Sequence, residues 1–353
     1  MRIKKIFTWL LLSTLVFAGC GSSRPLETTE PETQDNTNVV VGFSQLGAES
    51  DWRSANTSSM KDAFCEAAGY TLVFKDGQQK QTNQITAIRT FIQQDVDYIV
   101  LAPVTESGWD SVMEEAKEAG IPIILVDRLV DTADKSLYQC WVGSDFELEG
   151  KKVCEWLNSY TRAHDIPAEK LHIVDLQGTL GSTAQLGRSR GLNEAALEHG
   201  WDIVALKDAD FTQEKGREVM ASLLKTYDNI NVVYCENDNE AIGAIKAIEA
   251  AGLVPGPDIL NGEIMVLSFD GINEEALNYA REGKIACIGE CNPLHGPRVE
   301  AMIRALRNGE TPEKYNYVEE RIFSALSDVT SIVVDDVEYE VTRPGEQSQD
   351  QNE

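Results

Sequence analysis

Polar side chains follow many of the short apolar runs in this 353-residue chain, at the points where buried β-strands would end. Carboxylates accept hydrogen bonds, arginine donates them in a planar fork, and aromatic rings cover apolar C–H surfaces, here from Trp52 and Phe211. Such groups together can bind a neutral polyol. The positions are Gln45 to Arg53, Asp76, Asp127-Arg128, Ser144-Asp145, Gln177, Asp208 to Phe211, Asn237-Asp238, Asp270 and Glu290.

A polar residue after one strand carries little information, because loops are exposed and polar by default. The set of such residues as a whole is more informative than any single one. In open parallel sheets, ligands bind beyond the carboxyl ends of the strands, so side chains from both halves of the chain are expected to converge there.

The elements that must position these residues alternate along the chain from Val39 onward. Strands are predicted at 39–44, 71–75, 97–102, 122–126 and 138–143, and again at 171–176, 202–206, 231–235, 264–269 and 285–288. Runs such as DYIVLA at 97–102 are continuously apolar, as strands buried on both faces must be. The pattern predicts an α/β fold of two Rossmann-like lobes, each with a five-stranded parallel sheet and right-handed crossovers.

Helices between the strands are predicted from apolar residues at positions i, i+3, i+4 and i+7. The clearest stripes are Met60-Ala63-Phe64-Ala67, Trp109-Val112-Met113-Ala116, Gly216-Val219-Met220-Leu223 and Val299-Met302-Ile303-Leu306.

Both ends of the chain lie outside this pattern. Residues 1–19 have a basic start and an apolar run too short to span a membrane, as in a signal peptide. Cys20 after Ala18-Gly19 resembles a bacterial lipobox, although Phe17 stands where Leu is usual, and a plain secretory signal cut elsewhere is the alternative. Residues 20–38 are then a lipidated cysteine and a flexible stalk, and 341–353 a disordered tail.

Six further cysteines would allow up to three disulfides in an exported protein: Cys65, Cys140, Cys154, Cys235, Cys287 and Cys291. Their pairing stays open. Cys65 on a helical stripe and Cys235 at a strand end are expected to act as small buried hydrophobes. Cys287, Cys291 and His295 invite a zinc interpretation, but a fourth ligand is missing and the spacing fits no structural site, so no metal is expected.

Several classes of protein are disfavoured. The net charge of −27 argues against nucleic acid as a partner. The chain has no G-x-G-x-x-G after its first strand, no P-loop and no G-x-S-x-G, and its four histidines favour no acid–base site. A glycosidase carboxylate pair is conceivable, but each candidate carboxylate has an amide or arginine neighbour. We therefore expect no enzyme and no cofactor.

Several segments resemble the type I periplasmic binding proteins of the ribose and galactose class. They are GFSQLGAESDWR from Gly42, DGQQKQTNQI from Asp76, LAPVTESGW from Leu101, LVDR ending at Arg128, DLQGTLGSTAQLGRSRG from Asp175, ADFTQEKGREVM from Ala209 and NDNEAIGAIKAI from Asn237. Within this class the resemblance is greatest to galactofuranose-binding proteins. It implies an N-terminal lobe (39–144 plus 291–319) and a C-terminal lobe (145–290 plus 320–340), joined by three crossovers near Ser144-Asp145, Glu290-Cys291 and Glu319-Arg321. The segment ACIGECNP departs from the pattern.

The resemblance also implies roles for individual residues. Glu49, Trp52, Arg53, Asp127 and Arg128 would hold a sugar from the N-terminal lobe, and Arg188, Phe211, Asn237, Asp270 and Glu290 from the other side. Arg190 is the alternative to Arg188. The resemblance implies a protein that binds a monosaccharide by hinge closure and delivers it to an ABC permease. Cys20 and the stalk predict an exported, lipid-anchored protein, which departs from the freely diffusing members of the family. A monomer is expected because nothing in the sequence suggests a self-association surface. A receptor that presents the closed form to a sensor kinase or chemoreceptor is the alternative, and an enzyme acting on sugars is the least favoured hypothesis.

Overall fold

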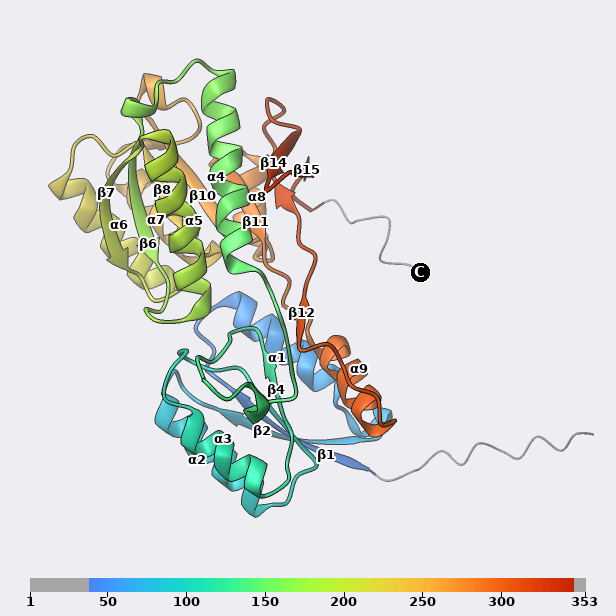
Figure 1. Ribbon diagram of the computed structural model, residues 1–353. Helices are drawn as coiled ribbons and strands as arrows, with labels where there is room; N and C mark the ends of the chain where they lie inside the picture. The colour runs from blue at the N-terminus through green and yellow to red at the C-terminus, as the bar shows by residue number, and fades with distance from the viewer. Residues whose placement is uncertain (1–37, 346–353) are drawn as a thin grey trace, which may run out of the picture. The chain divides into compact units, whose positions relative to one another are not determined.

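The computed structural model describes residues 38–345, which form one parallel and one mainly parallel sheet flanked by helices (Figure 1). The first sheet has the order β12-β5-β4-β3-β1-β2, with every neighbouring pair parallel. Its strands are β1 (Val39–Gln45), β2 (Tyr70–Asp76), β3 (Tyr98–Leu101), β4 (Ile123–Val126), β5 (Cys140–Gly143) and β12 (Tyr315–Tyr317). This arrangement is the parallel sheet that the first half of the sequence predicts.

Helices cover both faces of the first sheet, because alternate residues of each strand point to opposite sides. Val41 and Phe43 pack with α1 (Asp51–Ala63) and α9 (Gly296–Arg307). Ile99 and Leu101 pack with α2 (Gln81–Gln93) and α3 (Asp110–Glu118) on the other face. The continuously apolar strands therefore bury both of their faces.

The second sheet repeats this order in β7-β6-β8-β10-β11 and then continues with β13, β15 and β14. Its strands are β6 (His172–Gln177), β7 (Asp202–Asp208), β8 (Val232–Cys235), β10 (Glu263–Asp270), β11 (Ile285–Glu290), β13 (Ile322–Phe323), β14 (Ser331–Val334) and β15 (Val337–Thr342), with β9 (Val254–Pro255) beside β10. β13 runs antiparallel to β11.

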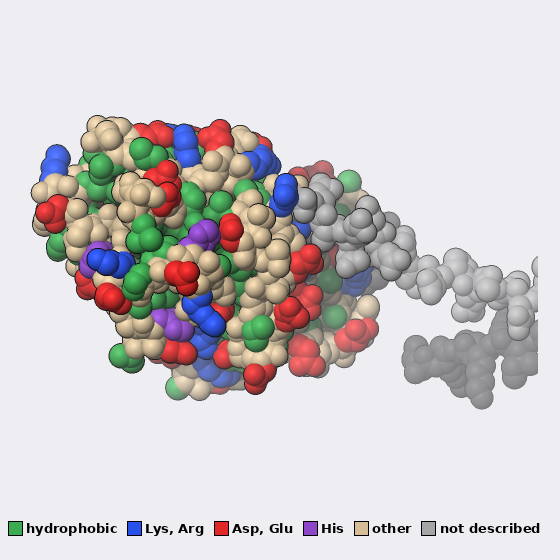
Figure 2. All heavy atoms as spheres, turned by 90° about the horizontal axis from the view of Figure 1, so that it is seen from above, with side chains coloured by type: hydrophobic (Ala, Val, Ile, Leu, Met, Phe, Trp, Pro, Cys, Tyr) green, Lys and Arg blue, Asp and Glu red, His purple; other side chains and the backbone are tan. Residues whose placement is uncertain are grey.

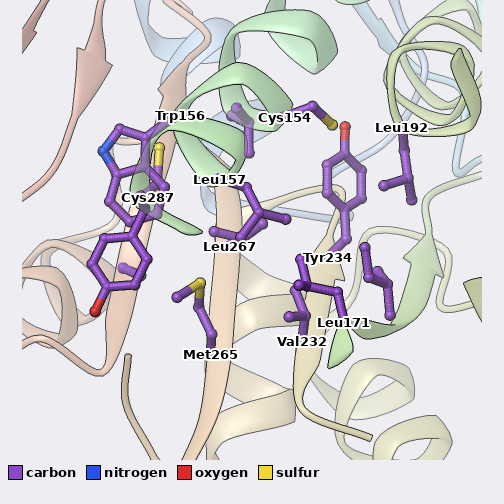
Figure 3. Close-up of a cluster of buried hydrophobic side chains, with 14 of the residues drawn as sticks. Cys154, Trp156, Leu157, Leu171, Leu192, Val232, Tyr234, Met265, Leu267 and Cys287 are labelled. Carbon is purple, nitrogen blue, oxygen red and sulfur yellow. The ribbon is translucent and has the colours of Figure 1, made fainter. Parts of the chain in front are cut away.

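Five helices flank the second sheet. α4 (Phe146–Ala163) and α5 (Thr183–His199) cover one face, and α6 (Gln213–Thr226), α7 (Asp238–Ala250) and α8 (Glu274–Arg281) cover the other. In Figure 3, Cys154 and Leu157 of α4 face Tyr234 and Leu267 of the sheet. This cluster is one of two apolar layers that fix the second sheet between its helices.

The chain passes between the two sheets three times. β5 of the first sheet leads at 144–145 into α4, β11 of the second leads at 291–295 into α9, and β12 of the first leads at 318–321 into β13. These segments, called the crossovers below, confirm the predicted three-crossover fold. They are hydrogen-bonded to the strand ends, as Val318 N is to Gly143 O and Glu290 N to Arg321 O.

The structure contains all ten predicted strands, with ends that differ by two residues or fewer. β9 and the strands after residue 314 were not predicted; β9, β12, β13 and β14 have only two to four residues, and strands this short show little periodicity. The predicted tail also begins too early, since Val341 and Thr342 pair with β13. Residues 1–37 and 346–353, including Cys20, lie outside the described part of the chain.

The six cysteines after Cys20 all carry free thiols. Five are buried, but the prediction of a buried Cys65 is wrong. α1 ends at Ala63, and the chain turns through a 3₁₀ turn at Glu66–Ala68 to Gly69, whose φ is +84°. Cys65 and Ala67 therefore lie beyond the helix, on the exposed side of this turn.

Acidic and basic side chains are interspersed on the face shown in Figure 2. Between residues 38 and 345, we find no helix whose length and apolar character would suit it to cross a membrane.

Candidate functional site

A small cavity, lined mostly by buried residues, lies where the carboxyl ends of strands from both sheets meet. It offers about 30 Å³ to the centre of a water-sized sphere, room for roughly two water molecules. Thirteen residues line the cavity: Glu49, Ser50, Trp52, Arg53, Asp127, Arg128, Phe146, Ala184, Arg188, Phe211, Asn237, Asp270 and Cys291.

The first sheet contributes a buried network of two arginines and two carboxylates. Arg53 lies in the first turn of α1, where its N–H donates to the capping Ser50 Oγ. Its Nε donates to Glu49 Oε1 at 3.0 Å and its Nη2 to Asp127 Oδ2 at 2.6 Å. Arg128 donates from Nη1 to Val104 O at 2.7 Å, and its Nη2 lies 3.8 Å from Glu49 Oε1. Each arginine is therefore oriented by partners from other segments.

These contacts shift the pKa values of the groups in opposite directions. Burial, together with the neighbouring Arg53, lowers the pKa of Arg128 to about 10. Burial alone would raise the pKa of Asp127, but Arg53 and Arg128 outweigh it and hold that pKa below its usual value. Asp127 is thus a carboxylate and both arginines are cations at neutral pH.

The second sheet contributes Arg188 from α5. Its Nε donates to Glu149 Oε2 at 2.8 Å, and its Nη2 lies 3.6 Å from Asp270 Oδ1 at the end of β10. Burial would lower the pKa of Arg188, but Glu149 and the other acidic groups around it raise that pKa well above its usual value. Burial raises the pKa of Asp270 against the opposing effect of Arg188.

Asn237 and three aromatic rings complete the cavity. Asn237 caps α7, where its Oδ1 accepts from Glu240 N at 2.8 Å, and its Nδ2 donates to Phe211 O at 3.0 Å. Trp52, Phe146 and Phe211 belong to one apolar cluster. Gly178 leaves the space that Phe211 fills, since a Cβ at Gly178 would lie 1.9 Å from Phe211 Cζ.

Several buried polar atoms of the cavity have no hydrogen-bond partner among residues 38–345. They are Glu49 Oε2, Arg53 Nη1, Arg128 Nε and Arg188 Nη2. An unpaired buried polar group costs about 1–3 kcal/mol, and more when it is charged. The cavity walls thus offer donors and acceptors to a ligand, and three arginines face three acidic residues there. This balance suits a neutral polyhydroxylated ligand better than an ion.

Residues 41–319 match the family described as periplasmic binding protein domain. The chain belongs to this family. It is 40% identical over 290 residues to the galactofuranose-binding protein YtfQ of Escherichia coli (strain K12), covering 81% of this chain and 87% of the relative.

Solved structures of proteins with bound sugars are similar to this chain. One from Mycobacterium smegmatis, in complex with β-D-fucofuranose, has 38% identity and a TM-score of 0.76 over 82% of this chain and 92% of its own. The binding protein of an arabinose ABC transporter from Shewanella sp. ANA-3, bound to α- and β-L-arabinofuranose, has 36% identity and a TM-score of 0.75, covering 82% and 93%.

Nine of the ten ligand-binding residues predicted for this periplasmic binding protein line the cavity: Glu49, Trp52, Arg53, Asp127, Arg128, Arg188, Phe211, Asn237 and Asp270. The tenth, Glu290, lies outside it, where its carboxylate pairs with Arg321 at 2.9 Å. Arg190, the alternative to Arg188, is exposed and pairs with Glu147. Of the other strand-end residues, Asp76 accepts from Gln78 N and Gln177 donates to Ser189 Oγ, so both serve local structure.

Three cavity residues were not among the predicted strand-end or binding residues: Phe146, Ala184 and Cys291. Phe146 follows the first crossover directly, and the combination of an aromatic residue with Ser144-Asp145 was a signal that could have revealed it. The three residues of the discarded zinc hypothesis have separate surroundings. Cys287 lies in the core of the second sheet, Cys291 contacts Ser144 Oγ, and His295 Nδ1 lies 3.1 Å from Asn56 Nδ2.

Proposed function

We propose that this periplasmic binding protein binds a monosaccharide, with a furanose ring as the favoured form, and delivers it to an ABC permease. The observation that carries the proposal is the cavity with three arginines, three acidic residues and three aromatic rings. Two relatives at 36–38% identity were solved with furanoses bound, and a third is a galactofuranose-binding protein. The ligand is released unchanged, since the chain is proposed to act as a binding protein and not as an enzyme.

The proposed binding mechanism is closure of two lobes, 39–144 plus 291–319 and 145–290 plus 320–340, around the sugar. Its ligand-binding residues are the nine predicted residues that line the cavity, together with Phe146. Trp52 and Phe211 would cover C–H faces of the ring, and the unpartnered arginine and carboxylate atoms would bind its hydroxyls. Hydrogen bonds made only in the closed form would shift the equilibrium toward closure.

We further propose that the protein is exported as a monomer and anchored through a lipid on Cys20, with residues 21–38 as the tether. Labelling cells with a fatty-acid analogue and comparing the wild type with Cys20→Ser checks this. Label on the wild type alone supports the anchor, and equal label on both proteins contradicts it.

A thermal-shift screen of the chain without residues 1–20 tests the binding function. The sugars are L-arabinose, D-galactose, D-fucose, D-ribose and D-fructose, and L-leucine and L-glutamate are the controls. A ligand at 100 times its dissociation constant stabilises the folded state by about 2.7 kcal/mol, so the melting temperature should rise with at least one sugar. A rise with an amino acid alone, or with no compound, contradicts the proposal.

A further inference from the structure

One carboxyl group connects all three crossovers. Glu320, in the third crossover, accepts two hydrogen bonds at Oε1. One comes from Ser144 Oγ of the first crossover at 2.6 Å, and the other from the N–H of Asn292 of the second at 2.7 Å. Lys152 Nζ of α4 also donates to the Glu320 carbonyl oxygen at 2.8 Å. Movement of one crossover relative to the others therefore changes the surroundings of this side chain.

A second buried carboxyl group lies against the first. A carboxylate oxygen of Glu149, one of Glu320 and the Sγ of Cys291 lie within 4.8 Å of one another. Glu149 Oε2 accepts from Arg188 Nε, whereas no N–H or alcohol group of the described residues donates to Glu149 Oε1. Glu149 thus stands between an arginine of the sugar cavity and the carboxyl group that joins the crossovers.

Two carboxyl groups in such a site do not both ionise easily, because each is desolvated and repels the other. Burial and then the charge of Glu149 raise the pKa of Glu320 well above its usual value. A proton on Glu320 allows its hydroxyl group to donate to Glu149, which keeps its own charge for Arg188.

We propose that Glu149 and Glu320 share one proton, and that this hydrogen bond makes Glu149 a positioning residue that links Arg188 of the sugar cavity to the crossovers. The inference extends the proposed sugar binding. Other charged or titratable groups also face the pair: Arg188 on α5, Lys152 on α4, Asp270 at the end of β10, Cys291, and Arg298 on α9. Asp145 and Glu290 act in turn on Lys152.

Loss of the proton at high pH leaves two carboxylates in contact. They can separate only if Glu149 moves, together with the guanidinium group that it holds, or if the third crossover moves. Either movement disturbs the closed geometry around Arg188, so sugar affinity should fall as the pH rises.

The proton itself can be tested without any sugar. Infrared difference spectra between about pH 6 and pH 9.5 should show the C=O band of a protonated carboxyl group disappearing at high pH. Glu320→Gln should lack this component, and Glu319→Gln, an exposed neighbour, should retain it. An identical band in the wild type and Glu320→Gln overturns the proposal, as does a band that appears only after removal of metal ions by a chelator.

Sugar affinity tests the coupling to the cavity. With L-arabinose and D-galactose as probes, the dissociation constant of the wild type and of Glu319→Gln should rise by about tenfold or more over this pH range. In Glu320→Gln the dissociation constant at pH 6 should stay near the wild-type value, since an amide also donates to Glu149. Over the same pH range it should change less than about twofold. Equal pH dependence in all three proteins overturns the coupling.

Glu149→Gln provides a second variant in case Glu320→Gln does not fold. It should weaken binding at every pH and flatten the pH profile, because Arg188 loses its counter-charge. A profile as steep as that of the wild type overturns the proposal. If none of the five sugars of the thermal-shift screen binds at any pH, the proposed function fails, while the infrared experiment still decides whether the proton is shared.

Discussion

Three cavity residues, Asp127, Phe211 and Asp270, adopt a backbone conformation that side chains disfavour. Their φ angles are +64°, +59° and +91°. Aspartate tolerates this region because its short side chain can bond locally, but a phenylalanine there costs roughly 1–3 kcal/mol. The surrounding contacts must offset that cost. Residues held in unfavourable conformations cluster at binding sites, and here all three present their side chains to one cavity.

Asp270 allows the site to be tested at the level of one residue. Asp270→Ala should weaken sugar binding by about 2–4 kcal/mol, because it removes the carboxylate that lies 3.6 Å from Arg188 Nη2 and leaves ligand hydroxyls without a partner. Isothermal titration of the wild type and the variant measures the difference. Asp228→Ala, which removes an exposed aspartate outside the cavity, is the control. Wild-type affinity in Asp270→Ala would contradict the assignment of this residue to the site.

At the scale of the element, helix starts and strand ends hold the binding groups. Ser50 caps α1, which carries Trp52 and Arg53 in its first turn. Asn237 caps α7, and its side chain also lines the cavity. A residue at a helix cap is held by backbone hydrogen bonds. Its side chain therefore loses little conformational entropy when it binds the ligand.

Asn237 is expected both to stabilise the fold by capping α7 and to bind the sugar, and different substitutions can separate these two roles. Asn237→Ala should lower the free energy of unfolding by about 1 kcal/mol, from loss of the cap, and should also weaken sugar binding. Asn237→Asp keeps a capping oxygen and should lose affinity alone. Thr212→Ala, which removes the cap of α6 outside the cavity, should lose stability alone. Urea unfolding and titration with sugar measure the two quantities, and full affinity in both Asn237 variants contradicts the assignment.

At the scale of the whole molecule, the second sheet buries several acidic side chains close to one another. Asp175, Glu236 and Glu240 lie near one another with no exposed surface. Burial raises the pKa of Glu236 to about 8, although Ser189 and the N–H of Gly178 donate to it. Burial also raises the pKa values of Asp175 and Glu240. These groups are therefore protonated in the folded protein at pH values where the unfolded chain ionises them.

The stability of the protein should consequently fall as the pH rises. The pKa of Glu236 in the folded protein lies above its ordinary value of 4.5. The protonated Glu236 therefore stabilises the fold fully below pH 4.5, and this stabilisation disappears as the pH rises through about 8. One such group contributes a slope of up to about 1.4 kcal/mol per pH unit. Urea unfolding between pH 5 and pH 8.5 measures the slope. Glu236→Gln should reduce it, whereas Glu194→Gln, an exposed control, should not; equal slopes would contradict the prediction.

The sequence alone determined the strands, the carboxyl ends of those strands and hence most of the cavity residues. This was possible because the information is local: runs such as DYIVLA reveal buried strands, and parallel sheets bring their carboxyl ends together. Asp127, Asn237 and Asp270 were predicted on this basis and line the cavity.

The tertiary structure alone decided which side chains meet. Glu290 ends β11 like a binding residue but turns to Arg321, whereas Phe146 belongs to the cavity wall. Glu149 and Glu320 stand 171 positions apart in the chain and come together because three crossovers pack side by side. Such contacts depend on how helices and crossovers from distant segments pack, and neither the spacing nor the periodicity of the sequence records that packing.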